Sequence, residues 1–167
     1  MTGFKTATKT VAIRRLALVG AALILGTGAA SAQSPAFVGL GGAWSGTGTI
    51  SLSDGAKERI RCKASYVVGR GDARLQQSLR CASDSYRFDL TSDVVSQQGQ
   101  IAGSWSEASR GISGTLVGRE NGGSISAVVD APGFSARLSL TTSGNKQNFS
   151  LSSDGDITSV IIALRKD

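Results

Sequence analysis

The feature of this sequence that most limits its fold is an alternation of apolar and polar residues with a period of two. From residue 42 onward, clusters rich in Gly, Asn, Asp and Ser interrupt the alternation at intervals of roughly 8 to 14 residues. The first cluster is Ser53-Asp54-Gly55 and the last is Asp154-Gly155-Asp156. Period-two alternation is typical of strands with one buried face, and such clusters are typical of turns. The nine clusters therefore predict ten strands.

The two cysteines fit one hairpin of this pattern. Both Cys62 and Cys81 fall on the apolar row of their segments. A turn centred on Gly71 and Asp72 pairs residues whose numbers sum to about 143, which places the two cysteines opposite each other on one face. Opposite positions of an antiparallel pair lie within reach of a disulfide. We therefore predict a Cys62–Cys81 disulfide.

The strand pattern predicts an all-β domain over residues 42–167, a single antiparallel meander of about ten strands that closes into a barrel. Closure is favoured because it removes the free edges of a half-apolar sheet. A β-sandwich is the alternative, since strand number and spacing alone do not distinguish the two. Several glycines share the apolar rows, where they leave room either for tightly coiled strands or for a cavity. They are Gly46, Gly48, Gly103, Gly114 and Gly118.

The start of the first predicted strand carries a family resemblance. Trp44 follows Gly42 by two residues and opens a ten-strand meander. In this the chain resembles the calycin-type barrels, which include lipocalins, avidins and fatty-acid-binding proteins. It is also similar to small secreted alphaproteobacterial proteins. The first resemblance implies a barrel that binds a ligand, but it assigns no ligand-contacting residue to a position of this sequence.

Residues 1–32 have the three parts of a cleavable signal peptide. A basic start is followed by an apolar run from Leu16 to Leu25 and by the small residues Ala30-Ser31-Ala32. The run is too short for a membrane span, so we expect no transmembrane anchor after cleavage. Residues 33–41 then form an extended or mobile lead-in. The expected location is periplasmic or secreted, which suits a disulfide.

Removal of the signal peptide changes the charge of the chain. The full sequence has 18 Lys and Arg against 12 Asp and Glu, and four of the basic residues but none of the acidic ones lie in the signal. The remainder has 18 − 4 = 14 basic and 12 acidic residues, a net charge of +2. With aromatic residues at 5%, this predicts no nucleic-acid partner and argues against the aromatic girdles of an outer-membrane barrel.

Catalytic chemistry has little support in the composition. Histidine is absent, which removes the most common general base near neutral pH and the most common metal ligand. We therefore predict a protein that is not an enzyme and uses no cofactor and no metal. Glu107 lies three residues before Arg110 on an apolar row. We interpret the two as an ion pair at the barrel rim rather than as acid–base machinery.

The leading functional hypothesis is non-catalytic binding of a small apolar or amphiphilic ligand inside the barrel. It depends on the glycines of the inner rows, which can open space beside large aromatic side chains. The residues predicted to line this cavity are Trp44, Tyr66, Phe88, Trp105 and Glu107.

The alternative hypothesis is an envelope-associated protein-interaction or inhibitor module. It would use a basic outer face of neighbouring strands to bind an anionic envelope component. In the deduced register Lys63 lies opposite Arg80, an unfavourable pair unless an anion or a neighbouring carboxylate compensates. Asp89 and Asp93 of the following strand could neutralise the face instead. The predicted patch consists of Arg59, Arg61, Lys63, Arg74 and Arg80.

Overall fold

The computed structural model describes Gly3, residues 36–69, Gly71 and residues 73–167. Apart from Gly3, the predicted signal peptide lies outside the described residues, as do residues 33–35 of the lead-in. Of the predicted turn at residues 70–72, only Gly71 is described, with a positive φ of 72°. Within the described ranges, no helix is long and apolar enough to cross a membrane.

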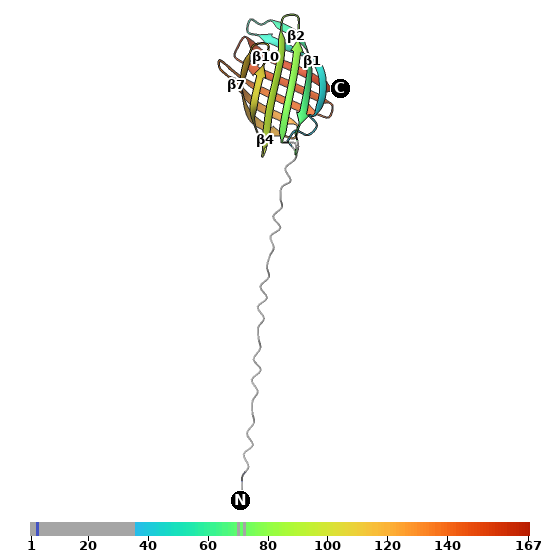
Figure 1. Ribbon diagram of the computed structural model, residues 1–167, viewed down its shortest axis with the longest axis vertical. Helices are drawn as coiled ribbons and strands as arrows, with labels where there is room; N and C mark the ends of the chain where they lie inside the picture. The colour runs from blue at the N-terminus through green and yellow to red at the C-terminus, as the bar shows by residue number, and fades with distance from the viewer. Residues whose placement is uncertain (1–2, 4–35, 70, 72) are drawn as a thin grey trace. The chain divides into compact units, whose positions relative to one another are not determined.

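Ten antiparallel strands follow one another along the chain and close into a barrel. Closure occurs where the first strand pairs with the last, for example Gly46 with Leu164. Figure 1 shows the two walls, in which the green strands around β2 cross the orange and red strands behind them. The predicted all-β barrel is thereby confirmed, and the sandwich alternative is wrong. The strands are β1 (Gly42–Leu52), β2 (Lys57–Val68), β3 (Arg74–Ala82), β4 (Arg87–Gln97), β5 (Gln100–Glu107), β6 (Ile112–Asn121), β7 (Ser124–Ala131), β8 (Phe134–Ser143), β9 (Lys146–Ser153) and β10 (Ile157–Lys166).

The β2–β3 hairpin has the register deduced from the sequence. Cys62 pairs with Cys81 and Ala64 with Leu79. The two cysteines form a disulfide with a sequence separation of 19 residues. A loop of this size is expected to stabilise the fold by about 3 kcal/mol through the entropy of the unfolded chain. The disulfide is also typical of proteins from oxidising compartments.

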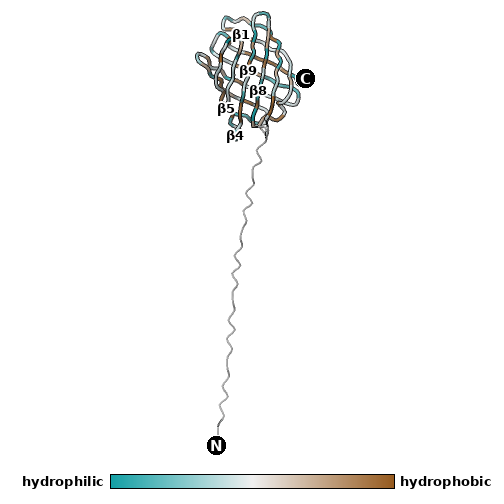
Figure 2. The backbone as a smooth tube through the Cα atoms, viewed as in Figure 1, coloured by the Kyte–Doolittle hydropathy of each residue, from teal (hydrophilic) through white to brown (hydrophobic). Residues whose placement is uncertain are grey.

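Each strand turns one row of side chains inward and the other outward. Along the tube in Figure 2, hydrophobic and hydrophilic residues accordingly alternate through much of the barrel. The inner-row glycines allow neighbouring backbones to approach closely, because a Cβ atom on Gly46 would overlap the carbonyl oxygen of Ala163, and one on Gly114 that of Asp130. The surroundings of these glycines thus fit the first of the two predicted roles, tightly coiled strands with closely spaced backbones, and none of the five lines the interior cavity described below.

The lead-in differs from the sequence-based expectation. Its described part, residues 36–40, forms a turn instead of an extended segment. Phe37 and Leu40 are 1% and 2% exposed and belong to the hydrophobic core. The indole of Trp44 donates a hydrogen bond to the Leu40 carbonyl at 2.8 Å. We call the barrel end where β1 begins and β10 ends the plugged end, because this segment fills it.

Candidate functional site

The two ends of the barrel differ in how well their inward side chains are covered. Toward the plugged end they are buried, as Ile101, Leu116 and Leu140 illustrate. Toward the other end, where the β5–β6 and β9–β10 turns lie, inward apolar residues are only half-buried, although they pack against the same core. Phe88 and Ile157 are two examples. We call this the open end, since solvent reaches the barrel interior there.

A cavity of about 270 Å³ occupies the interior toward the open end. Its wall is predominantly apolar and includes residues from most of the strands, among them Ile60, Leu79, Trp105, Leu138, Phe149, Leu151 and Val160. The indole of Trp105 is fixed by a hydrogen bond to the Thr115 carbonyl at 3.1 Å and packs edge-on against Phe134, with ring centroids 5.8 Å apart. The wall is therefore held in place independently of any occupant.

Besides Ser153 and the charged residues of the rim, Gln77 and Ser92 interrupt the apolar wall. Ser92 donates a hydrogen bond to the Gln77 side-chain carbonyl oxygen at 3.0 Å, and both residues line the cavity. Gln77 is half-buried, and its amide NH₂ remains a donor toward the cavity. The wall thus combines a large apolar surface with a few polar groups, of which Gln77 and Ser92 form a hydrogen-bonded pair.

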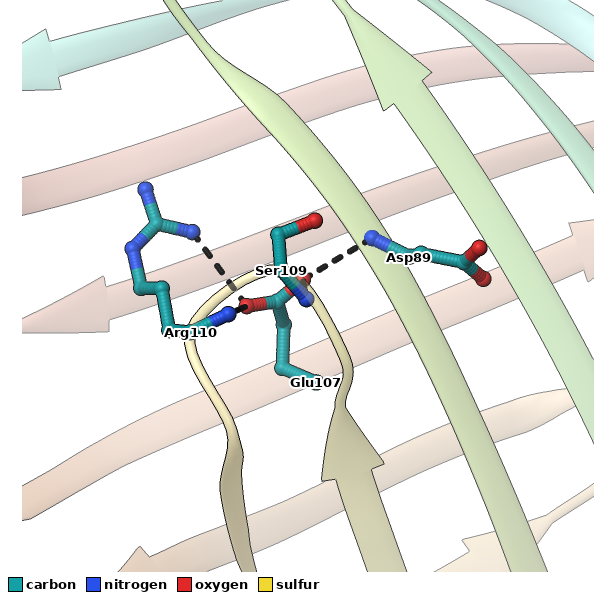
Figure 3. Close-up of polar contacts among 4 residues, drawn as sticks. All are labelled: Asp89, Glu107, Ser109 and Arg110. Carbon is teal, nitrogen blue, oxygen red and sulfur yellow. Dashed lines mark hydrogen bonds and ion pairs between the residues drawn. The ribbon is translucent and has the colours of Figure 1, made fainter.

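Glu107, Arg110 and the β5–β6 turn form the rim of the cavity (Figure 3). Glu107 is buried, and one of its carboxylate oxygens accepts the backbone N–H groups of Asp89 and Ser109 at 2.9 and 3.0 Å. The other oxygen accepts the backbone N–H of Arg110 at 2.9 Å. It also receives the Arg110 guanidinium at 3.5 Å, which confirms the predicted ion pair. The carboxylate therefore joins the turn to β4.

These contacts determine how Glu107 titrates. Burial alone would raise the pKa of Glu107, but the N–H donors of Asp89, Ser109 and Arg110 outweigh it and lower the pKa below its usual value. The side chain is an anion near neutral pH, and its oxygens accept hydrogen bonds from the β5–β6 turn and from Asp89 of β4. A general acid would require the opposite shift, and a general base would require a free oxygen.

Arg110 covers one side of the cavity entrance. Its guanidinium carbon lies 4.7 Å from the centroid of the Phe88 ring, a cation–π contact, and 37% of its side chain is exposed. Asp156, from the β9–β10 turn, is exposed and lines the same entrance. The rim thus carries charge of both signs above an apolar interior.

The structure brings together three of the five residues predicted for the cavity. Phe88, Trp105 and Glu107 line it, whereas Trp44 and Tyr66 do not. The last two are core residues of the plugged end, 0% and 4% exposed, with ring centroids 6.5 Å apart. They share an inward orientation with the others, but alternation along a strand does not indicate which end of a barrel is filled.

A buried polar pair near the plugged end was not foreseen from the sequence. Tyr66 donates a hydrogen bond from its hydroxyl to the side-chain carbonyl oxygen of Gln147 at 2.8 Å. Gln147 is 1% exposed and donates in turn to the Thr142 hydroxyl at 3.1 Å. Burial raises the pKa of Tyr66, and the bond to Gln147 offsets this only in part. From the sequence alone, a polar glutamine would be assigned to the outer face of the strand, because its buried hydrogen-bond partner is not known.

The predicted basic patch divides into two groups. Arg74 and Arg80 form ion pairs with carboxylates of β4, Arg74 with Asp93 at 2.5 Å and Arg80 with Asp89 at 3.1 Å. Arg59, Arg61 and Lys63 are exposed and make no ion pair within the described residues. Arg61, Lys63 and Arg80 line a groove on the outer face of the barrel. Arg87, which was not part of the prediction, lines the same groove.

In the part of the chain that is described, no three His, Cys, Asp or Glu side chains are grouped closely enough to hold an ion.

Comparison with known proteins supports the fold. No protein-family model matches this sequence, and a comparison with curated proteins also finds no match. Among solved structures, the chain is similar to Rv2717c from M. tuberculosis, with a TM-score of 0.63 and 16% identity over 80% of this chain and 98% of that one. It is also similar to the S-type phycobiliprotein lyase CPES from Guillardia theta, with a TM-score of 0.51 and 8% identity over 76% and 88% of the two chains. Both neighbours are ten-strand barrels, and at these identities the likeness concerns the fold alone.

Proposed function

We propose that this protein is an exported, non-catalytic binding protein that holds a small apolar or weakly amphiphilic molecule in the barrel cavity. The observation that carries the proposal is the preformed cavity of about 270 Å³ with a mainly apolar wall and one accessible end. Concave, largely apolar sites with a few polar groups are where proteins bind small molecules. Export is supported by the signal-like first 32 residues and by the Cys62–Cys81 disulfide.

The size and polarity of the cavity limit the ligand. A cavity of about 150 Å³ binds benzene, which has six non-hydrogen atoms, so on the same scale this cavity accommodates about eleven. A charged group inside the wall would be left without a partner, which is costly, so the apolar part of the ligand enters first. Any polar group of the ligand then lies at the Gln77–Ser92 pair or at the rim.

The absence of catalysis is part of the proposal. Among the described residues, Glu107 is the one carboxylate that is both buried and on the cavity wall, and its oxygens accept backbone N–H groups of the β5–β6 turn and of Asp89 in β4. The sequence contains no histidine that could act in its place. Rigid binding, rather than proton transfer, is the role that these contacts support.

Two consecutive residues of β10 provide a test with an internal control. Val160 lines the cavity, whereas Ile161 faces outward and is 60% exposed. We expect 1-naphthol, a neutral probe of suitable size, to bind the wild-type protein with an increase in thermal stability. A probe at about 100 times its Kd adds about 2.7 kcal/mol to the free energy of unfolding. V160W, which fills the cavity, should bind at least about tenfold more weakly, and I161W should bind like wild type.

Several outcomes would contradict the proposal. One is a wild-type protein that neither binds the probe nor carries a ligand when its native mass is compared with its denatured mass. Another is a V160W variant that binds as tightly as I161W, because binding would then take place outside the barrel. If V160W fails to fold, as judged by far-UV circular dichroism, the smaller change Leu151→Phe in the same wall replaces it.

A further inference from the structure

The register of the barrel aligns basic side chains across its outer face. On one line across neighbouring strands, Lys146 of β9 lies beside Arg165 of β10, Arg165 beside Ser45 of β1, Ser45 beside Lys63 of β2, and Lys63 beside Arg80 of β3. Strands lie about 4.8 Å apart, so this line extends over roughly 19 Å. Its four cations come from segments far apart in the sequence, and all four are exposed.

A second line runs parallel to the first, one outward position along the strands. It contains Thr47 of β1, Arg61 of β2, Ala82 of β3 and Arg87 of β4. The small side chains lie between the long basic ones and leave a depression. This is the groove of the outer face, and its lining includes Ser45, Thr47, Arg61, Lys63, Arg80, Arg87 and Ser109.

Carboxylates compensate only part of this charge. Asp89 lines the groove and pairs with Arg80 at 3.1 Å. At the edge of the groove, Asp167 accepts a hydrogen bond from Ser45 at 2.5 Å. Arg61, Lys63 and Arg87 form no ion pair among the described residues. Lys63 lies directly opposite Arg80, and like charges on adjacent strands repel. With Asp89 compensating only Arg80, the groove keeps an excess of positive charge, which favours an anionic partner.

We propose that this outer groove binds a linear anionic glycan through carboxylate groups that recur along the chain. Arginine binds carboxylates with two parallel hydrogen bonds, and three of the four groove cations are arginines. The hydroxyls of Ser45, Thr47 and Ser109 both donate and accept, which suits the hydroxyl groups of sugars. An elongated line of cations suits a polymer better than a single ion. A nucleic-acid strand is disfavoured because the face offers no platform of aromatic side chains for its bases.

The test measures binding of polygalacturonate to the full-length protein by calorimetry at low ionic strength, with neutral dextran as a control polymer. We expect polygalacturonate to bind and dextran not to, with an affinity that falls as salt is added. The double variant Arg61→Gln/Lys63→Gln should weaken binding at least tenfold. Its matched control is Arg119→Gln/Arg137→Gln, which removes the same charge from exposed positions of β6 and β8 and should bind like wild type.

The possible results separate the groove from overall charge and from other anions. Equal weakening in the two double variants would overturn the proposal, because net charge alone would then explain binding. No binding of polygalacturonate would overturn it as well. Binding to vesicles that contain an anionic phospholipid, without binding to polygalacturonate, would show that the partner is a lipid surface and not a glycan. The V160W variant should bind polygalacturonate normally, which keeps this result independent of the cavity.

Discussion

Glu107 is a single side chain on which the conformation of a whole turn depends. It is buried and accepts three backbone N–H groups as an anion, so its pKa is lower in the folded protein than in the unfolded chain. A lowered pKa adds stability that is complete well above the unfolded value of about 4.3 and is lost as the pH falls through the folded value. We expect E107Q to lose about 2 kcal/mol of unfolding free energy at about pH 7 and less at about pH 4.

Urea unfolding at the two pH values tests this prediction, and a loss that is equal at both would contradict it. Glu120 serves as the control, because burial raises the pKa of its carboxyl group instead of lowering it. Replacing Glu120 by Gln removes a charge that burial disfavours, so E120Q is not expected to lose stability at about pH 7.

Predictions for single residues succeed where the interaction depends only on residues close in the sequence. The alternation places Phe88, Trp105 and Glu107 on the inner face, and the spacing of Glu107 and Arg110 within one turn predicts their ion pair. The backbone N–H groups that surround Glu107 could not be foreseen, because one of them belongs to Asp89 of the neighbouring strand. The same limit applies to every contact whose partner depends on strand register.

Among the elements, the lead-in segment has a larger role than its sequence indicates. Phe37 and Leu40 are almost fully buried, whereas Val38 between them is 58% exposed. Phe37→Ala should therefore lower the unfolding free energy by about 3 kcal/mol through loss of buried surface and formation of a cavity. Val38→Ala should change it by less than about 0.5 kcal/mol. Similar losses in the two variants, measured by urea denaturation, would show that the segment does not plug the barrel.

The sequence predicts the strands but not the burial of the lead-in segment. The strands can be predicted because their apolar and polar residues alternate, and the β2–β3 register follows from two cysteines and one turn. The lead-in has no repeat, since it contributes only two buried side chains around a turn. Glycine and proline near it suggest a connecting segment. Its packing depends on the space left at the end of a barrel, which is a property of all ten strands together.

At the scale of the whole molecule, closure of the barrel means that the fold depends on which strands pair and less on where along the barrel the chain starts. β1 pairs with β10, and the backbone N–H of Asp167 donates to the Ala43 carbonyl at 3.0 Å. A circular permutant that links Asp167 to Ala36 through a short flexible linker, with new ends between Gly122 and Gly123, should retain the barrel. We expect it to keep the far-UV circular dichroism spectrum and the 1-naphthol affinity of the wild-type barrel.

The permutant would contradict this expectation if it failed to fold or bound 1-naphthol much more weakly. Opening the chain between Val128 and Val129, within β7, provides the comparison, because that break interrupts a paired strand and should prevent folding.

The sequence could predict closure but not the asymmetry of the closed barrel. Ten half-apolar strands favour a structure without free edges, although their number and spacing are also compatible with a sandwich. Which end is filled depends on where Leu40, Trp44, Tyr66 and Gln147 meet, and these residues come from the lead-in, β1, β2 and β9. Because these residues fill one end, the cavity lies toward the other, and no single segment of the sequence could predict its position.

Closure also influences how long the molecule survives. A protease binds its substrate as an extended segment and needs backbone N–H and C=O groups that are free to pair with its cleft. In the described barrel each strand has a partner on both sides, so these groups are already engaged. Cleavage is therefore directed to the tips of the hairpins, which are short. The lifetime of this protein in the presence of proteases would be governed by its turns, and a cut in one of them would leave the ten-strand ring held together by its remaining pairs and its disulfide.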